Sequence, residues 1–277
     1  MTFERLICGA AMLASGTAIG AATPLSPSTT AKALKRGSAS SSVRLEYTDF
    51  SKLYGSRTVL TADSTLGTGQ ATRFIVSGSA GKRTGASTHR AAQGSVAVVH
   101  DWSDRLSTQT TASQANNGLV FARTMVAQDI SYKLGHGLVG TIGGKYSSYG
   151  SGNDLATWSA GAAYYLRGAF INYRYSMYAS NRFGRSHAHL VSFRVYDPGG
   201  GKGFTQLWAG HGTSLFEVEL PRAANGRFTS VALQRQQPIG GGTAINIGVN
   251  RGWYRSPTGR HSGTGVTVGL SFANWRL

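Results

Sequence analysis

The chain has little of what holds small exported domains together or carries a chain across a membrane as helices. Its 277 residues include one cysteine, Cys8, so neither an intrachain disulfide nor a cysteine-based metal site can form. No stretch reaches the 18 apolar residues of a transmembrane helix. Acidic residues are scarce too, with 11 Asp and Glu against 28 Lys and Arg and a net charge of +17. A disulfide-rich domain and a helical membrane protein are therefore excluded.

Glycine, in contrast, is abundant, with 38 residues. A glycine inside a helix costs about 1 kcal/mol relative to alanine, so a mostly helical fold is disfavoured. Collagen is excluded because the glycines have no three-residue period. Six prolines and 10% aromatic residues argue against a disordered chain. The composition predicts an all-β protein.

The N-terminus has the pattern of a secretory signal peptide. Arg5 precedes an apolar run over residues 6–14, and small residues continue to Ala22, where we expect cleavage. Residues 23–42 are rich in Ser, Thr and Pro and predict a flexible leader. We therefore expect a signal peptide over 1–22, a leader over 23–42 and one exported β domain over 43–277.

From Val43 onward, apolar residues alternate with small or polar ones. In 243–250, for example, Ile245, Ile247 and Val249 share one face, while Asn246 and Gly248 lie on the other. Strict alternation is typical of strands whose two faces meet different surroundings. Fourteen segments show it: 43–52, 57–67, 71–83, 87–102, 105–115, 119–133, 137–149, 154–166, 168–180, 185–197, 203–212, 226–236, 242–254 and 263–275.

The connections fall into two sets. Those after even-numbered segments are mostly tight, whereas those after odd-numbered segments are longer or more basic, as in 148–153, 212–225 and 255–262. Short turns at one rim and long loops at the other are typical of outer-membrane barrels. An open sheet of this size would leave two unpaired edges, which lipid cannot satisfy. The pattern predicts a closed antiparallel up-and-down transmembrane barrel of about 14 strands, with 12 as the alternative count. The competing interpretation is a secreted soluble sandwich or β-solenoid.

Three short segments resemble the YaiO-like family of outer membrane β-barrel proteins: Gly161-Ala-Ala-Tyr-Tyr-Leu-Arg-Gly168, Phe193-Arg-Val-Tyr196 and Leu207-Trp-Ala-Gly-His-Gly-Thr213. The resemblance implies a barrel over 43–277 and no defined activity. Barrels inserted by the outer-membrane assembly machinery usually end in an aromatic residue, whereas this chain ends in Leu277, with Trp275 upstream. We still expect that machinery to be a partner.

Arginine outnumbers lysine 21 to 7, and its guanidinium binds phosphate and carboxylate in a bidentate way. The alternation places four cations on the inner face: Arg123, Lys145, Arg174 and Arg194. Two interpretations remain open for this basic lumen. It forms an anion-attracting pore, or it is a plugged interior in which these cations pair with Asp63 and Asp129.

A second basic set is expected in the outer loops, where it would contact the phosphates of lipopolysaccharide. Its members are Arg83, Arg182, Arg185, Arg222, Arg227, Arg255 and Arg260. Nucleic acid is not an expected partner, because an exported barrel has none to meet.

Neither a metal site nor a catalytic centre is expected. His187 and His189 share a strand face, but they have no nearby cysteine and fit a histidine pair at the rim. A hydrolase would need a serine activated by a histidine, as Ser87 and His89 could provide, yet serines are so frequent that adjacency carries no signal. No cofactor motif is present, so we expect a protein that is not an enzyme.

Three functions follow, all in the outer membrane of a Gram-negative bacterium. The first is a porin-like channel or export conduit for an anionic solute or an exopolysaccharide. The second is a non-conducting structural barrel whose surface binds polyanions, and the third is a barrel hydrolase of lipid or lipopolysaccharide. The expected partners are outer-membrane lipid and lipopolysaccharide, with an anionic polysaccharide as a further candidate.

Overall fold

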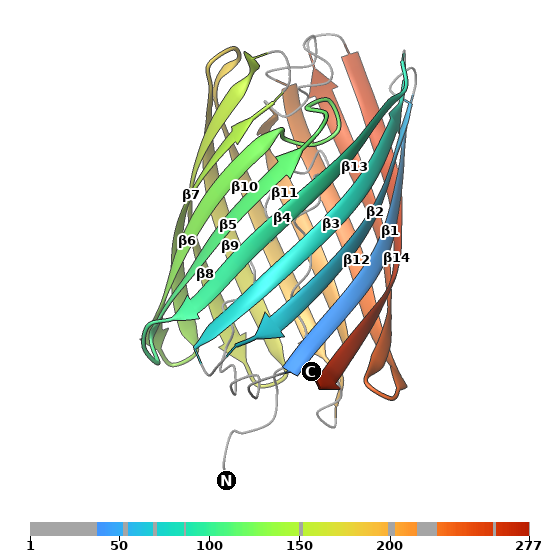
Figure 1. Ribbon diagram of the computed structural model, residues 1–277. Helices are drawn as coiled ribbons and strands as arrows, with labels where there is room; N and C mark the ends of the chain where they lie inside the picture. Colours follow the sequence, from blue (N-terminus) through green and yellow to red (C-terminus); the bar gives the residue numbers. More distant parts are fainter. Residues whose placement is uncertain are drawn as a thin grey trace.

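The computed structural model describes residues 38–51, 55–68, 71–85, 87–149, 152–198, 203–214, 226–256 and 259–276. They form one closed barrel in which each strand pairs antiparallel with its neighbours in sequence and β1 pairs with β14 (Figure 1). The strands are β1 (Ser38–Phe50), β2 (Ser56–Gly67), β3 (Thr72–Thr84), β4 (His89–Asp101), β5 (Leu106–Ala115), β6 (Thr124–Gly135), β7 (Leu138–Ser148), β8 (Asp154–Leu166), β9 (Ala169–Ser180), β10 (Gly184–Tyr196), β11 (Phe204–Ser214), β12 (Gly226–Gly240), β13 (Thr243–Ser256) and β14 (Gly259–Arg276). The expected fold, with 14 strands rather than 12, is confirmed.

The first strand differs from expectation, because β1 begins at Ser38, inside the segment expected to be a leader. Its serines extend the barrel by pairing with β2, where the hydroxyl groups of Ser41 and Ser64 are hydrogen-bonded at 3.0 Å. The expected signal peptide and residues 23–37 of the leader lie outside the described residues. Within the described residues, no helix is long and apolar enough to cross a membrane.

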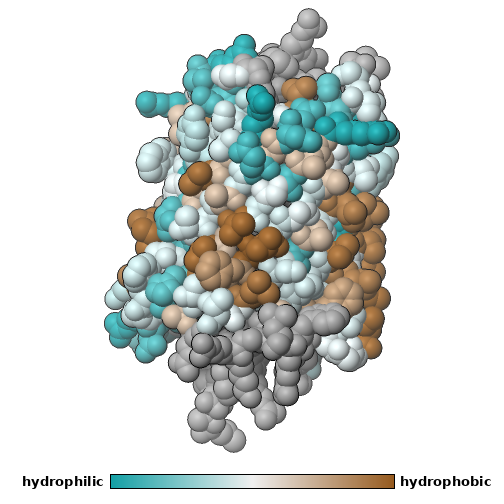
Figure 2. Space-filling view, in the orientation of Figure 1, coloured by the Kyte–Doolittle hydropathy of each residue, from teal (hydrophilic) through white to brown (hydrophobic). Residues whose placement is uncertain are grey.

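The outer face of the barrel is apolar. Large hydrophobic side chains alternate along the strands and remain exposed, as Ile142 in β7, Ile247 in β13 and Val268 in β14 do. Figure 2 shows them gathered over the lower part of the molecule, with hydrophilic side chains towards the top. A soluble sandwich would bury these side chains, whereas lipid stabilises them where they are. The competing soluble interpretation is therefore wrong.

The inner face is made of small and polar residues. Ser192, Asn246 and Arg174 are buried although they are polar. The odd and even positions of each strand thus separate the side chains that face lipid from those that line the lumen.

The two ends of the barrel differ. We call the end with the connections after even-numbered strands the turn end, and the opposite end the loop end. Both the start of β1 and the end of β14 lie at the turn end (Figure 1). The asymmetry is weaker than expected at one hairpin, because β13 runs to Ser256 and β14 starts at Gly259, which leaves two residues where a loop over 255–262 was expected.

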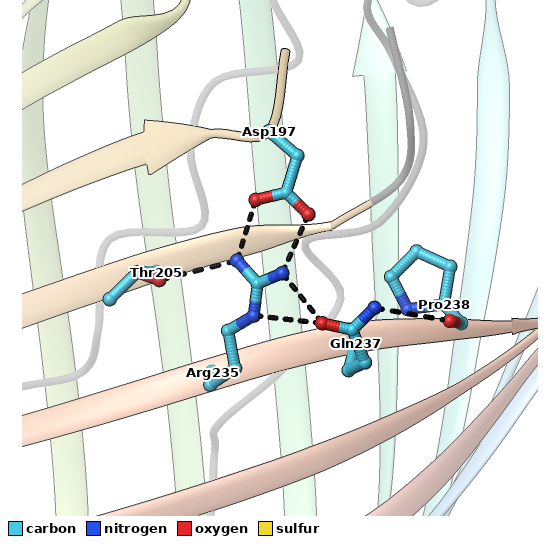
Figure 3. Close-up of polar contacts among 5 residues, drawn as sticks. All are labelled: Asp197, Thr205, Arg235, Gln237 and Pro238. Carbon is cyan, nitrogen blue, oxygen red and sulfur yellow. Dashed lines mark hydrogen bonds and ion pairs between the residues drawn. The ribbon is translucent and has the colours of Figure 1, made fainter. Parts of the chain in front are cut away.

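A bidentate ion pair ties three neighbouring strands together at the turn end (Figure 3). Arg235 of β12 donates to both carboxylate oxygens of Asp197, which follows β10, at 2.6 and 2.7 Å. It also donates to Thr205 of β11 and to Gln237 of its own strand. These hydrogen bonds hold the pKa of Asp197 below its ordinary value. The pair therefore joins the residue after β10 to β11 and β12.

The Asp197→Asn variant tests this pair through its pH dependence. Because the folded-state pKa is lowered, the stabilisation is present above the unfolded pKa of about 3.9 and is lost as the pH falls through the lower folded value. Both side chains are about one-third exposed, so solvent limits the gain at neutral pH to less than about 1 kcal/mol. Urea unfolding in phospholipid vesicles should show wild type and variant converging as the pH drops to about 2. An unchanged difference at both pH values would contradict the assignment.

Replacing Ile142 by Arg tests the lipid-facing assignment. Ile142 lies in the middle of β7 with 61% of its surface exposed. A charge at the bilayer midplane costs a barrel about 2–4 kcal/mol, and the cost falls to about 0–1 kcal/mol near the interface. The free energy of unfolding in vesicles should fall accordingly. Ser148→Arg, on the same face at the loop end of β7, is the matched control and should be nearly neutral.

Candidate functional site

The candidate functional site is the lumen, where inward-facing cations exceed inward-facing carboxylates among the described residues. Because β1 and β8 are half the ring apart, groups on β1 and β2 lie on the opposite wall from groups on β7 to β9. The inward cations are Arg44, Arg57, Arg73, Arg83, Lys133, Lys145, Arg174 and Arg194, and the inward carboxylates are Glu46, Asp63, Asp101 and Asp129.

One basic cluster is built by β6 to β9. Arg174 donates through Nη2 to Oδ1 of Asp129 at 2.7 Å and to Oγ of Ser159 at 2.5 Å. Lys145 of β7 lies within electrostatic reach of both Arg174 and Asp129. The cluster thus holds two cations and one carboxylate, so it carries a net positive charge.

A glycine makes room for this cluster. A Cβ atom at Gly143 would lie 1.9 Å from Oδ1 of Asp129 and 2.9 Å from Nη2 of Arg174, and Cβ atoms essentially never approach another heavy atom that closely. Any residue other than glycine at position 143 of β7 would therefore displace the ion pair between Asp129 and Arg174.

The second basic cluster lies on the opposite wall. Nε of Arg44 is 2.8 Å from Oε1 of Glu46, and both side chains are almost completely buried. Arg57 of β2 is within electrostatic reach of the same carboxylate. Here too, two guanidinium groups share one carboxylate, and the net charge is positive.

Arg194 has a different role from the one expected. Its guanidinium carbon lies 4.1 Å from the ring centroid of Phe204 and 5.0 Å from that of Phe170, and its Nε donates to Gln206 at 2.7 Å. Tyr196 lies alongside, 5.9 Å away. Arg194 is therefore held in an aromatic box near the turn end, where it fills space and is not free to contact a solute.

At the loop end the lumen becomes apolar. A buried cluster lines it from β8 round to β1, with Tyr149 and Phe183 packed against the cluster. Its members are Phe50, Leu155, Tyr178, Ala188, Phe228 and Tyr254. Burial among these side chains raises the pKa of the Tyr149 phenol. This loop-end cluster places apolar side chains in the lumen at the loop ends of β1, β8, β9, β10, β12 and β13.

The connection between β5 and β6, residues 116–123, also packs against the inner wall. Val120 and Phe121 are buried against Val59, Ala91 and Ala115 on the walls of β2, β4 and β5. The turn is fixed by Asn117, whose backbone carbonyl accepts hydrogen bonds from the backbone amides of Val120 and Phe121 at 3.4 and 3.3 Å. We call residues 116–123 the inward loop.

The inward loop explains why Arg123 is not where the alternation placed it. The strand was expected to begin at residue 119, but β6 begins at Thr124, and Arg123 is exposed at the loop end. Its backbone amide donates to the carbonyl of Ser148 at 2.8 Å, while its guanidinium does not line the lumen between strands. The alternation of apolar and polar residues extends N-terminal to Thr124, where β6 begins. Alternation alone does not distinguish a strand from a segment that turns into the lumen.

The expected outer-loop arginines also shift. Arg182 is exposed in the 181–183 turn, and Arg222 lies outside the described residues. The hairpins rise further than expected, so the other members belong to strands. Arg185, Arg227, Arg255 and Arg260 are exposed on the outer face at the loop ends of β10, β12, β13 and β14, whereas Arg83 of β3 points inward over the ring of Phe50.

The histidine and serine candidates do not form a catalytic or metal centre in the described part of the chain. His187 and His189 face outward with ring centroids 5.7 Å apart, and His189 is hydrogen-bonded to the phenol of Tyr173. Ser87 and His89 are hydrogen-bonded at 2.7 Å, but the described residues provide no carboxylate to orient that histidine. No group of three or more metal-ligating side chains occurs among the described residues.

Fold and lumen together define a membrane β-barrel of the outer-membrane type. The chain belongs to the YaiO family, since the model of the YaiO membrane beta barrel domain matches residues 39–215. That match covers β1 to β11, and β12 to β14 complete the ring.

Solved outer-membrane channels share the fold at low sequence identity. The CymD monoaromatic hydrocarbon channel matches with a TM-score of 0.58 and 7% identity, over 86% of this chain and 89% of its own. A bacterial polysaccharide outer membrane secretin matches with a TM-score of 0.54 and 9% identity, over 86% and 99%. An anion-selective porin from Comamonas acidovorans matches with a TM-score of 0.48 and 12% identity, over 85% and 98%. The chain is thus an outer-membrane barrel that shares its fold with the CymD channel and the polysaccharide secretin.

Replacing Phe121 by Ala tests whether the inward loop narrows the lumen. Phe121 is 4% exposed, so losing its ring should lower the free energy of unfolding by about 3 kcal/mol and should widen the lumen beside Val59. Single-channel conductance in planar bilayers should rise. Phe193→Ala removes the same ring from the lipid-facing side of β10 and should leave conductance unchanged; an equal effect of both variants would contradict the assignment.

Proposed function

We propose that this barrel is a channel for small anionic solutes. The observation that carries the proposal is the pair of net-positive clusters on opposite walls of the lumen, one around Arg174 and Asp129 and one around Arg44 and Glu46. Each contains more cations than carboxylates.

The electrostatics follow from the position of these clusters. Charges of one sign inside a lumen with low-dielectric walls focus the field along its axis, which raises the local concentration of counter-ions. Rings of Arg and Lys side chains select anions in pores. Because each carboxylate is shared by two cations, pairing reduces the positive charge without cancelling it.

The size of the lumen favours a small solute over a polymer. Barrels of 8 strands are filled by side chains, and those of 16 to 18 hold a water channel, so a 14-stranded barrel is intermediate. The loop-end cluster and the inward loop narrow it further. An exopolysaccharide chain would need both to move aside, whereas a small anion needs only a narrow path.

The second candidate is a non-conducting barrel with a structural or polyanion-binding role. The loop-end cluster favours it, because buried aromatic side chains cover one mouth of the lumen. We infer that the protein is not an enzyme. Among the described residues, no carboxylate orients His89 in the Ser87–His89 pair.

Planar-bilayer recordings separate the channel from the non-conducting barrel, and the Lys145→Gln variant tests the preference for anions. In planar bilayers with a KCl gradient, the reversal potential of the wild type should show a preference for chloride. Removing the inward charge of Lys145 should reduce that preference, and Arg174→Gln, which leaves Asp129 without its 2.7 Å partner, should reduce it further.

Lys82→Gln is the matched control. Lys82 of β3 is exposed on the outer face, so the same change of charge should leave the reversal potential unaltered. A cation-selective wild type would overturn the anion channel. Silent bilayers, with a barrel that still migrates anomalously in unboiled gel samples, would favour the non-conducting barrel.

A further inference from the structure

Three arginines lie side by side on the outer surface of the barrel. Arg227 of β12 is directly opposite Arg255 of β13, and Arg255 is directly opposite Arg260 of β14. All three side chains are exposed and lie on the same face as the lipid-facing residues Val249 and Val266. We call these three residues the arginine row.

The arginine row is electrostatically unfavourable without a ligand. Side chains directly opposite in an antiparallel sheet have Cβ atoms about 5 Å apart, and like charges at that spacing destabilise the sheet. No hydrogen bond or ion pair joins these three guanidinium groups to any described residue. The outward carboxylate on the neighbouring strand β1 is Asp49, which lies opposite Thr264, four residues along β14 from Arg260. An anion from outside the chain would relieve the repulsion.

The depth of the arginine row identifies that anion. Trp253 precedes Arg255 by two residues on β13, on the side away from the loop end, and it is exposed on the same outer face. Tryptophan is enriched at the level of the membrane headgroups. Arg251 follows below it and is already engaged, donating to the hydroxyls of Thr264 and Ser262. The exposed aliphatic side chains begin deeper, at Val249 and Val266, so the arginine row lies beyond the aliphatic band, on the headgroup side of Trp253.

We propose that Arg227, Arg255 and Arg260 form a binding site for the phosphate groups of lipopolysaccharide. The loop end is the outward rim of a barrel of this type, so the row faces the outer leaflet. Guanidinium groups bind phosphate oxygens through two parallel hydrogen bonds, which an ammonium group cannot do. The site lies on the outside of the barrel and does not depend on conduction through the lumen.

The test is calorimetric titration of the detergent-solubilised full barrel with purified lipopolysaccharide. The double variant Arg255→Gln/Arg260→Gln should weaken binding roughly tenfold or more, because it removes two charge-assisted contacts. The double variant Arg255→Lys/Arg260→Lys keeps both charges but loses the two parallel hydrogen bonds of each guanidinium. Its affinity should lie between those of the wild type and the glutamine variant. Lipopolysaccharide stripped of its phosphates should bind the wild type as weakly as intact lipopolysaccharide binds the glutamine variant.

Arg105→Gln/Arg167→Gln is the matched control, since it removes two exposed arginines at the turn end. It should bind lipopolysaccharide as the wild type does. The proposal is overturned if this control loses as much affinity as the test variant, if the test variant loses none, or if inorganic phosphate binds the row as tightly as the lipid does. The reversal potential of the test variant should equal that of the wild type. Loss of lipopolysaccharide binding can then be distinguished from a failure of the proposed channel.

Discussion

The closed ring of backbone hydrogen bonds is the constraint on which the rest of this structure depends. Hydrocarbon offers no partner for an unpaired N–H or C=O group, so a sheet in lipid must pair its last strand with its first. Here β1 and β14 do so along the whole length of β1, from Ser38 to Phe50. Once the ring is closed, every strand has one face in lipid and one in the lumen, and period-two alternation decides which side chains meet which surroundings.

That local rule explains how much of the fold could be predicted. The expected strand limits agree with the observed ones to within a few residues, and Lys145, Arg174 and Arg194 lie on the inward face as expected. Each of these results needs only the residues next to it in the chain. The low number of charged residues also made the strands easier to predict, because few charges interrupt the apolar residues of the lipid-facing side of each strand.

What the sequence could not predict depends on contacts between distant residues. Arg174 and Asp129 are 45 residues apart, and their pairing needs the absent side chain of Gly143 on an intervening strand. The inward loop is similar, because Phe121 is apolar in a segment that alternates, and only the wall formed by Val59 and Ala91 distinguishes it from a strand residue. Arg194 was placed on the right face, but its aromatic box comes from three strands.

The scarcity of acidic residues shapes both surfaces of the barrel. Inside, Glu46 is shared between Arg44 and Arg57 and Asp129 between Arg174 and Lys145, so positive charge remains in both clusters. Outside, the arginine row has no described carboxylate to neutralise it. A guanidinium cannot shed its proton to avoid this repulsion, because its pKa is too high. Positive charge of this kind is tolerated only where water or an anionic ligand reaches it, and in a membrane barrel those places are the lumen and the headgroup layer. The excess of positive charge on both surfaces therefore has one origin, the shortage of carboxylates in the chain.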